Sequence, residues 1–309
     1  MKRIKLKTLM GPVILGMIVT VASAYPISPR PLRLLVEESE FILVAHVRDI
    51  QEVKRKKDDH FGGHLAMLTV REVLKGNLGD TIVQVAFNKY MICPAPPFFE
   101  KGTDALVFLD KRNNTYSVHA LSYGVKTLTK LEIEIYKTRI HEMQEIMSMT
   151  DADQKFVVTA EWLVKCAENP ATREEGVYEL SPKSNFMSYY DRNDKMPFEF
   201  TLSDSQKLRL KDALLSTPSM SYSDIGLVDL IYPRYSEQVF TYLVEQLHGH
   251  QEDQWWFAGA CMNRINLFKS TEHTKELAAE YDNVLFGDRS KKEDQKKIIH
   301  DFISEIEKL

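Results

Sequence analysis

Two histidines, His60 and His64, flank a Phe-Gly-Gly run and have side chains that can bind a metal ion. A zinc site needs three or four such ligands, and the spacing supplies no third. A surface loop is therefore the favoured interpretation. The run 191–196 resembles the start of a calcium loop, but Met196 stands where that loop requires glycine. The sequence thus predicts no metal site and no bound cofactor.

The motifs of the common catalytic classes do not occur in the sequence. It contains no phosphate-binding loop, nucleophile elbow, dinucleotide-binding glycine pattern or HExxH zinc motif. We therefore predict no catalytic residues and favour a non-enzymatic protein. An unrecognised hydrolase is kept as an alternative, and it would need histidine and carboxylate side chains that converge in one cleft.

Three cysteines, Cys93, Cys166 and Cys261, are separated by long stretches of chain. An odd number at wide spacings implies no disulfide framework. Cys166 and Cys261 lie beside apolar residues in helical patterns, which favours buried thiols, and the sequence does not decide whether any of the three pair.

Exposed aromatic side chains are the remaining candidates for a functional surface, because such groups anchor protein interfaces. Trp255 stands in a cluster with Trp256 and Phe257, and on a helix it would point away from the face of Trp256. Tyr189 and Tyr190 lie in a polar, acidic segment between helices. We predict Trp255, Tyr189 and Tyr190 as partner-binding residues, with packing in the core as the alternative.

The elements that would carry these residues follow a short export signal. Residues 1–24 contain four basic side chains, an apolar run from Leu9 to Val21 and the ending Ala22-Ser23-Ala24. This is the pattern of a cleaved secretory signal peptide. The apolar run is well short of the roughly 20 residues that span a bilayer. We expect an exported protein, periplasmic or extracellular, with no stable membrane anchor after cleavage.

The balance of charge argues against nucleic acid as a partner. The chain has a formal net charge of -4, and the signal accounts for four positive charges, so the remainder carries -8. A chain of this charge is a poor general binder of nucleic acid or anionic lipid. The basic run 54–57 is followed at once by two aspartates, which is typical of a solvated loop.

The front half of the chain has the pattern of a small β-barrel with a closing helix. Strand-like runs alternate with turns, and a helical apolar face follows at Ile133, Tyr136, Ile140, Met143 and Met147. The predicted strands cover residues 41–47, 65–74, 81–87, 105–109 and 115–120. Five strands and a packing helix predict an OB-like barrel, with a half-open sandwich as the alternative.

Three of these segments resemble one known family. The runs 39–47, 70–76 and 101–109 are similar to strands of the netrin-like domain of tissue inhibitors of metalloproteinases and its bacterial relatives. The resemblance covers roughly residues 30–125 and implies the OB-type fold. Inhibitors of that family bind a protease zinc through an N-terminal cysteine, whereas here the predicted first residue is Tyr25 and no cysteine precedes Cys93. The resemblance therefore does not imply the inhibitory activity.

The back half has a helical pattern throughout. Val157, Ala160, Val164 and Ala167 share one face, and Asn169-Pro170 is expected to cap and begin the next helix. A capping box at Ser203 starts a helix that carries Leu208 and Leu215. Further helices are expected near 223–232, 235–248, 254–267 and 273–286 and after Ser290. The segment 162–173 resembles a HEAT or armadillo helical hairpin, so eight helices in four pairs predict an irregular α-solenoid, with a compact bundle as the alternative.

Together these patterns predict an α+β protein of two domains: a signal peptide over 1–24, a netrin/OB-like barrel domain over 25–150 and an all-helical domain over 151–309. The favoured function is an exported, non-catalytic protein-interaction or adaptor protein. Its partner would be another protein. The alternatives are a binder or inhibitor of a secreted protease and the unrecognised hydrolase.

Overall fold

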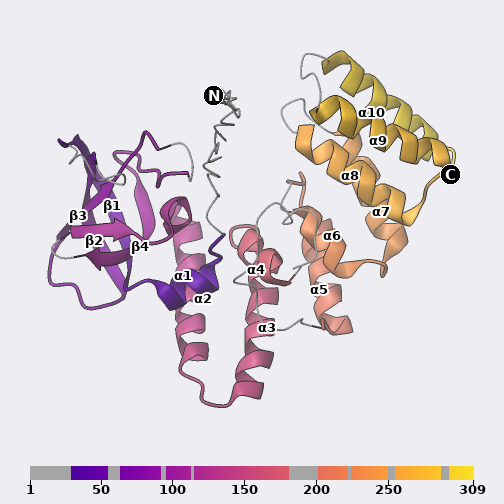
Figure 1. Cartoon of the computed structure of the whole chain (residues 1–309). Coiled ribbons are helices and arrows are strands. Elements are labelled where there is room, and N and C mark those ends of the chain that lie inside the picture. Colours follow the sequence, from indigo (N-terminus) through magenta and orange to yellow (C-terminus); the bar gives the residue numbers. More distant parts are fainter. Residues whose placement is uncertain are drawn as a thin grey trace, which may run out of the picture.

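The computed structural model describes residues 29–54, 63–91, 95–112, 115–180, 201–221, 224–249, 255–286 and 292–309. A closed β-barrel forms one end of the described structure, and helical hairpins extend from it to the other end (Figure 1). The predicted α+β fold, an OB-like barrel followed by an all-helical region, is confirmed. The predicted signal peptide lies outside the described residues.

The barrel has the strand order β1-β2-β3-β5-β4, and a β1–β4 pairing closes it. All of its pairings are antiparallel except that between β3 and β5. This closure excludes the half-open sandwich. The strands are β1 (Phe41–Glu52), β2 (His64–Lys75), β3 (Ile82–Phe87), β4 (Asp104–Arg112) and β5 (Thr115–Val118). A short β6 (Val125–Thr127) adds to the free side of β4.

β1 is buried on both of its faces over residues 42–45, as its continuous apolar sequence predicts. One face, including Leu43 and Ala45, contributes to the core inside the barrel. The opposite face, including Ile42 and Val44, packs in a second core with the neighbouring helices. The strand is therefore shared by two hydrophobic cores.

Two helices cover this outer face of the barrel. α2 (Lys130–Met147) begins at a capping box between Thr129 and Glu132 and buries the predicted face of Ile133, Tyr136, Ile140 and Met143. α1 (Leu32–Glu38) was not predicted, because its seven residues are too few for the spacing of Leu32, Leu35 and Val36 to stand out as a helical period. Its backbone amide at Leu32 donates a 2.7 Å hydrogen bond to Glu175.

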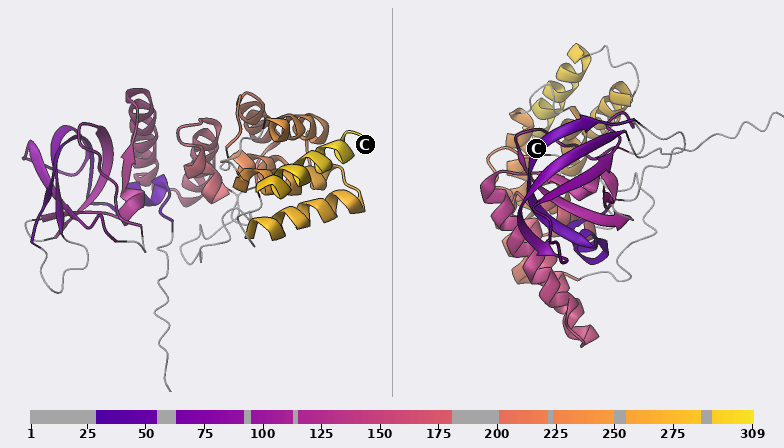
Figure 2. Two further views of the ribbon diagram at one scale, coloured as in Figure 1. Left: turned by 90° about the horizontal axis from the view of Figure 1, so that it is seen from above. Right: turned by 90° about the vertical axis from the view of Figure 1, so that its left-hand side faces the viewer.

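The helical region consists of hairpins stacked in sequence order, as Figure 2 shows from above. α3 packs on α5 and α5 on α7, while α4 packs on α6 and α6 on α8. This nearest-neighbour arrangement is that of an α-solenoid. The pairs are α3 (Ala152–Glu168) with α4 (Arg173–Leu180), α5 (Asp204–Leu215) with α6 (Ile225–Ile231), α7 (Ser236–His248) with α8 (Trp255–Phe268), and α9 (Glu272–Phe286) with α10 (Lys292–Ile306).

Two of the predicted helix faces are confirmed only in part. Val164 and Ala167 of the predicted α3 face are fully buried, but Val157 is 64% exposed, and α3 also buries Trp162, Leu163 and Cys166. Leu208 is 43% exposed, and Leu210 and Leu214 are the buried leucines of α5, although the capping box at Ser203 is confirmed. In each case several faces of the helix carry apolar residues, and the neighbouring hairpins determine which one is buried.

The first hairpin also begins differently from the prediction. Asn169 is the C-cap of α3 rather than the N-cap of α4, and its side-chain oxygen accepts a hydrogen bond from the Ala171 amide. Pro170 lies in the turn, and α4 starts only at Arg173. The turn lets α4 pack closely on α3: a Cβ atom at Gly176 would lie 2.3 Å from the Leu163 carbonyl oxygen.

One hydrophobic core runs from the outer face of the barrel through α1 and α2 into the solenoid as far as Phe302 and Ile306. Polar contacts reinforce the joint. Lys126 and the Tyr136 hydroxyl contact Glu175 at 2.6 and 3.0 Å, and Arg33 contacts Glu179 at 2.6 Å. The barrel is therefore fused to the solenoid through buried contacts.

Candidate functional site

The three predicted partner-binding residues are not tested by the structure. Tyr189 and Tyr190 fall within 181–200, which lies outside the described residues, as does the calcium-like run 191–196. Trp255 is the first residue of α8, but its side chain is outside the description. These three assignments stay predictions.

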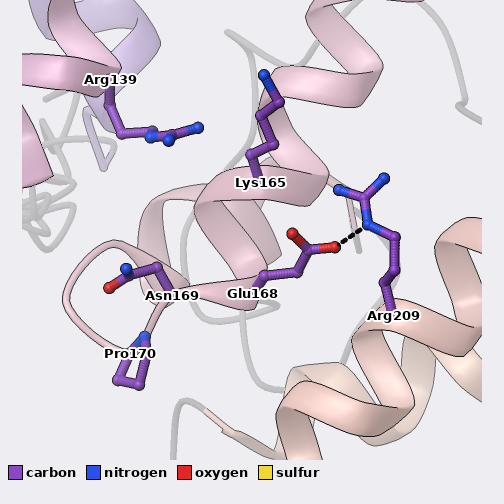
Figure 3. A pocket seen from close by; sticks show the side chains of 6 residues that line it. All are labelled: Arg139, Lys165, Glu168, Asn169, Pro170 and Arg209. Carbon is purple, nitrogen blue, oxygen red and sulfur yellow. Dashed lines mark ion pairs between the residues drawn. The ribbon is translucent and has the colours of Figure 1, made fainter.

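A surface cleft of about 410 Å³ lies where α2, the first helical hairpin and α5 meet (Figure 3). We call it the basic cleft. Its lining residues are Arg139, Lys165, Glu168, Asn169, Pro170 and Arg209. Three of the six are cations and one is an acid, so the lining itself is positively charged.

The local fold explains why these side chains converge. Arg139 projects from α2, whereas Lys165 and Glu168 occupy the last turn of α3. Arg209 comes from the next hairpin, on α5. Because α3 ends at the Asn169 C-cap, the turn brings Asn169 and Pro170 into the lining of the cleft. No sequence motif indicates this site, since its cations are separated by 26 and 44 positions.

One wall of the basic cleft has its positive charge well paired. Arg209 makes an ion pair with Glu168 and a 2.6 Å ion pair with Glu161. These pairs raise the pKa of Arg209. Burial acts in the opposite direction on the Glu161 carboxyl, but hydrogen bonds from Gln206 and Arg209 hold its pKa below the ordinary value. This wall joins the first two hairpins.

On the opposite wall, one carboxylate pairs with two cations. Glu142 is shared by two cations, with Arg139 Nη1 at 2.8 Å and Lys165 Nζ at 3.4 Å. The Arg139 Nη1 and Nε atoms are buried and make no hydrogen bond. The short contact between Nη1 and Glu142 Oε2 is thus an ion pair in which the carboxylate lies off the N–H direction, and this Oε2 atom is likewise buried without a hydrogen bond.

A second feature is an aromatic patch at the end of the barrel where β2 begins and β3 ends. We define it by Tyr90 and Phe98, which are 65% and 67% exposed. The Tyr90 ring packs on the buried His64 ring with centroids 5.1 Å apart, and His64, Phe87 and Phe99 continue beneath it at 5.4 and 5.1 Å. Tyr90 therefore stands on a packed aromatic base, and Phe98 precedes Phe99 of that base in the chain.

His64 is part of that base and is not exposed, contrary to the predicted surface loop. It is 2% exposed, and neither ring nitrogen makes a hydrogen bond. Burial, followed by the charge of Lys89, lowers the pKa of His64. The strand places this residue inside because it is the first residue of β2, opposite Phe87. His60 lies outside the described residues.

Other histidine–carboxylate contacts occur on the barrel but do not converge in the basic cleft. His119 lies between Asp110 at 2.9 Å and Glu38 at 3.0 Å, so both of its ring nitrogens are engaged. His46 contacts Asp104 at 2.8 Å across the β1–β4 pairing. Across the described ranges, no three His, Cys, Asp or Glu side chains form a group that could hold a metal ion.

Comparison of the sequence with models of known protein families and with curated proteins gives no match. Within the part of the chain that the structure describes, no helix is both long enough and apolar enough to cross a membrane. The geometry of the basic cleft and the aromatic patch is therefore the basis for a functional proposal.

Proposed function

We propose that this chain is an exported, non-catalytic adaptor that binds another protein through the aromatic patch and the surface of its solenoid. The sequence supports export through the basic, apolar and Ala-x-Ala parts of residues 1–24. The observation that carries the proposal is the exposed ring of Tyr90 above a packed aromatic base, with the exposed Phe98 next to Phe99 of that base in the chain.

Large aromatic side chains of this kind are more favourably placed in a protein interface than in contact with water. Burying a large aromatic side chain against a partner removes a large apolar area from solvent, and such residues dominate interface energetics. Lys89 lies 4.9 Å from the Tyr90 ring centroid, which adds a cation beside the apolar contact. An apolar centre beside a charge is the usual composition of an interface.

The solenoid supports the same interpretation through its shape. Each hairpin contacts its neighbours in sequence, so the array presents an extended surface rather than a closed globule (Figures 1 and 2). Solenoids characteristically use such surfaces for binding. The barrel and the solenoid share one core, so both surfaces are held in a fixed relation.

Partner capture with matched variants tests the proposal. The chain from residue 25 is incubated with the envelope and secreted fractions of its source, crosslinked under mild conditions and analysed by mass spectrometry. We expect Tyr90→Ser and Phe98→Ser each to reduce capture of the same protein by about tenfold, the effect of losing one aromatic hot spot. Leu131→Ser is the control, because Leu131 is 73% exposed but lies on α2, outside both the aromatic patch and the solenoid hairpins.

The proposal fails if no protein is captured, or if the captured protein is retained equally by all three variants. A catalytic turnover of the captured protein would also contradict a non-catalytic role.

A further inference from the structure

We propose that the aromatic patch is a pH-controlled binding surface: His64 supports Tyr90 while its imidazole is neutral and moves toward Glu52 when it takes up a proton, so that the partner protein is released in acid. This inference rests on the proposed adaptor function and specifies how binding at the same patch is regulated. It starts from the position of His64 beneath Tyr90.

The position of His64 suits only the neutral form of its ring. The residue is 2% exposed, and its ring packs on Tyr90 and Phe87 with centroids 5.1 and 5.4 Å away. Neither ring nitrogen forms a hydrogen bond to a described residue. A neutral imidazole has one N–H donor, whereas the imidazolium has two and carries a positive charge. Because a buried charge without partners is far more costly than a buried neutral group, uptake of a proton disfavours this position.

The cation next to Tyr90 adds to the same effect. Lys89 follows β3, and its ammonium lies 4.9 Å from the Tyr90 ring centroid. A protonated His64 would bring a second positive charge to the same ring. Aromatic rings attract a cation, but they do not accept both imidazolium N–H groups as water or a carboxylate does. Burial, followed by the charge of Lys89, lowers the pKa of His64, in agreement with this geometry.

Glu52 provides the protonated ring with another position. It lies directly opposite His64 in the β1–β2 pairing, and side chains opposite each other in such a pair project from the same face of the sheet. Glu52 is exposed. Its negative charge raises the pKa of His64, against the larger effect of burial. By moving outward, the imidazolium therefore gains both water and a carboxylate.

The movement of His64 would remove the support of the exposed tyrosine. Tyr90 is 65% exposed and packs on the His64 ring, while Phe87 and Phe99 also pack on each other at 5.1 Å. Without His64, Tyr90 is separated from the rest of the base. A side chain that is not held in place must be ordered when the partner binds, and this ordering weakens the association. Protonation of one buried histidine thus lowers the affinity of the patch.

Nuclear magnetic resonance tests the movement without a partner. The chain from residue 25 carries ¹³C-labelled histidine and tyrosine rings and is titrated from pH 7.5 to pH 4.5, with circular dichroism to verify that it stays folded. The His64 signal is the one absent from His64→Phe. We expect a nuclear Overhauser contact between the His64 and Tyr90 rings at pH 7.5 and its loss as His64 is protonated, at a pH below the ordinary value of 6.5. Rings that stay in contact after protonation, or a folded chain in which His64 stays neutral at pH 4.5, would overturn the inference.

Partner capture over the same pH range tests the effect on binding. Wild type should capture about tenfold less at pH 4.5 than at pH 7.5, the effect of losing one aromatic hot spot. Glu52→Gln should shift this loss to lower pH, because it removes the charge that favours protonated His64. Glu134→Gln removes an exposed carboxylate on α2 and should follow wild type. Capture by His64→Phe should fall much less on acidification, and Glu52→Gln provides the test if His64→Phe does not fold.

The outcomes separate this inference from the adaptor proposal. The pH control is wrong if wild-type capture is constant from pH 7.5 to pH 4.5, or if Glu52→Gln and Glu134→Gln lose capture at the same pH. Capture at pH 7.5 that still depends on Tyr90 and Phe98 would then leave the adaptor proposal standing. An absence of capture at pH 7.5 would remove both.

Discussion

At the scale of single residues, burial changes the chemistry of side chains that would be reactive in water. Cys166 and Cys261 are free and fully buried, and burial raises the pKa of both thiols. Thiols of this kind are poor nucleophiles because the thiolate is the reactive form. The expectation that these two cysteines are buried thiols is confirmed. Burial likewise changes the pKa of the His64 imidazole, which it lowers.

His64 makes stability depend on pH. Its folded-state pKa is lowered from the ordinary value of 6.5, so the unfolded chain binds a proton more readily than the folded one. Stability is then highest above about pH 6.5 and falls as the pH decreases from 6.5 toward the lowered pKa. We predict that the free energy of unfolding falls less on acidification in His64→Phe, which keeps a ring of similar size but has no group to protonate.

Chemical denaturation of both proteins at pH 7.5 and pH 5 measures the effect. Other titrating groups are common to the two proteins, so the difference between their pH dependences reports on His64. An identical loss of stability on acidification in wild type and His64→Phe would show that His64 is protonated equally in both states.

At the scale of secondary-structure elements, the sequence predicts those strands and helices that have alternating apolar residues, a helical apolar period or a cap. All five barrel strands and α2 through α10 correspond to predicted segments, although the Asn169 cap that predicted the start of α4 belongs to the end of α3. α1 could not be predicted in this way, since its helix depends on contacts with Glu175 and Glu179, more than 140 positions away. The basic cleft was missed for the same reason: only the packing of α2, α3 and α5 brings its cations together.

Close packing between α3 and α4 depends on one missing side chain. A Cβ at Gly176 would lie 2.3 Å from the Leu163 carbonyl oxygen and 2.5 Å from the Ala167 amide nitrogen. Both are backbone atoms that cannot move without shifting α3. We predict that Gly176→Ala lowers the free energy of unfolding by about 1–3 kcal/mol, the usual cost of overpacking.

Denaturant titration checks this prediction, and Gly79→Ala is the matched control. A Cβ at Gly79 has no heavy atom within 4 Å, so its effect should stay within about 0.5 kcal/mol. Equal effects at the two glycines would mean that the α3–α4 interface adjusts without cost.

At the scale of the whole molecule, the predicted boundary near residue 150 divides the chain by fold but also crosses a continuous core. α1 and α2 pack against the barrel on one side and α3 and α4 on the other. Burial raises the pKa of Glu179, and the adjacent Arg33 guanidinium opposes this rise, which shows how far the joint is removed from water. Sequence patterns define each part but contain little information on the joint.

We predict that residues 25–150 alone are less stable than the same barrel within residues 25–309. The isolated piece loses the partners of Arg33, Lys126 and Tyr136 and exposes the α2 face that packs on α3. Its unfolding temperature should fall by about 5 °C or more, the shift for each kcal/mol lost in a domain of this size. Calorimetry of both proteins measures it, and equal temperatures would indicate that the barrel folds independently of the solenoid.

The double burial of β1 also has a consequence for sequence variation. In β3 buried and exposed positions alternate, so a library of single substitutions should show tolerance at every second residue. In β1 residues 42–45 are all buried, and each faces one of two different cores. Tolerance should therefore be low at consecutive positions: a change at Ile42 would damage the core that connects the barrel to the solenoid, and a change at Leu43 would damage the core inside the barrel.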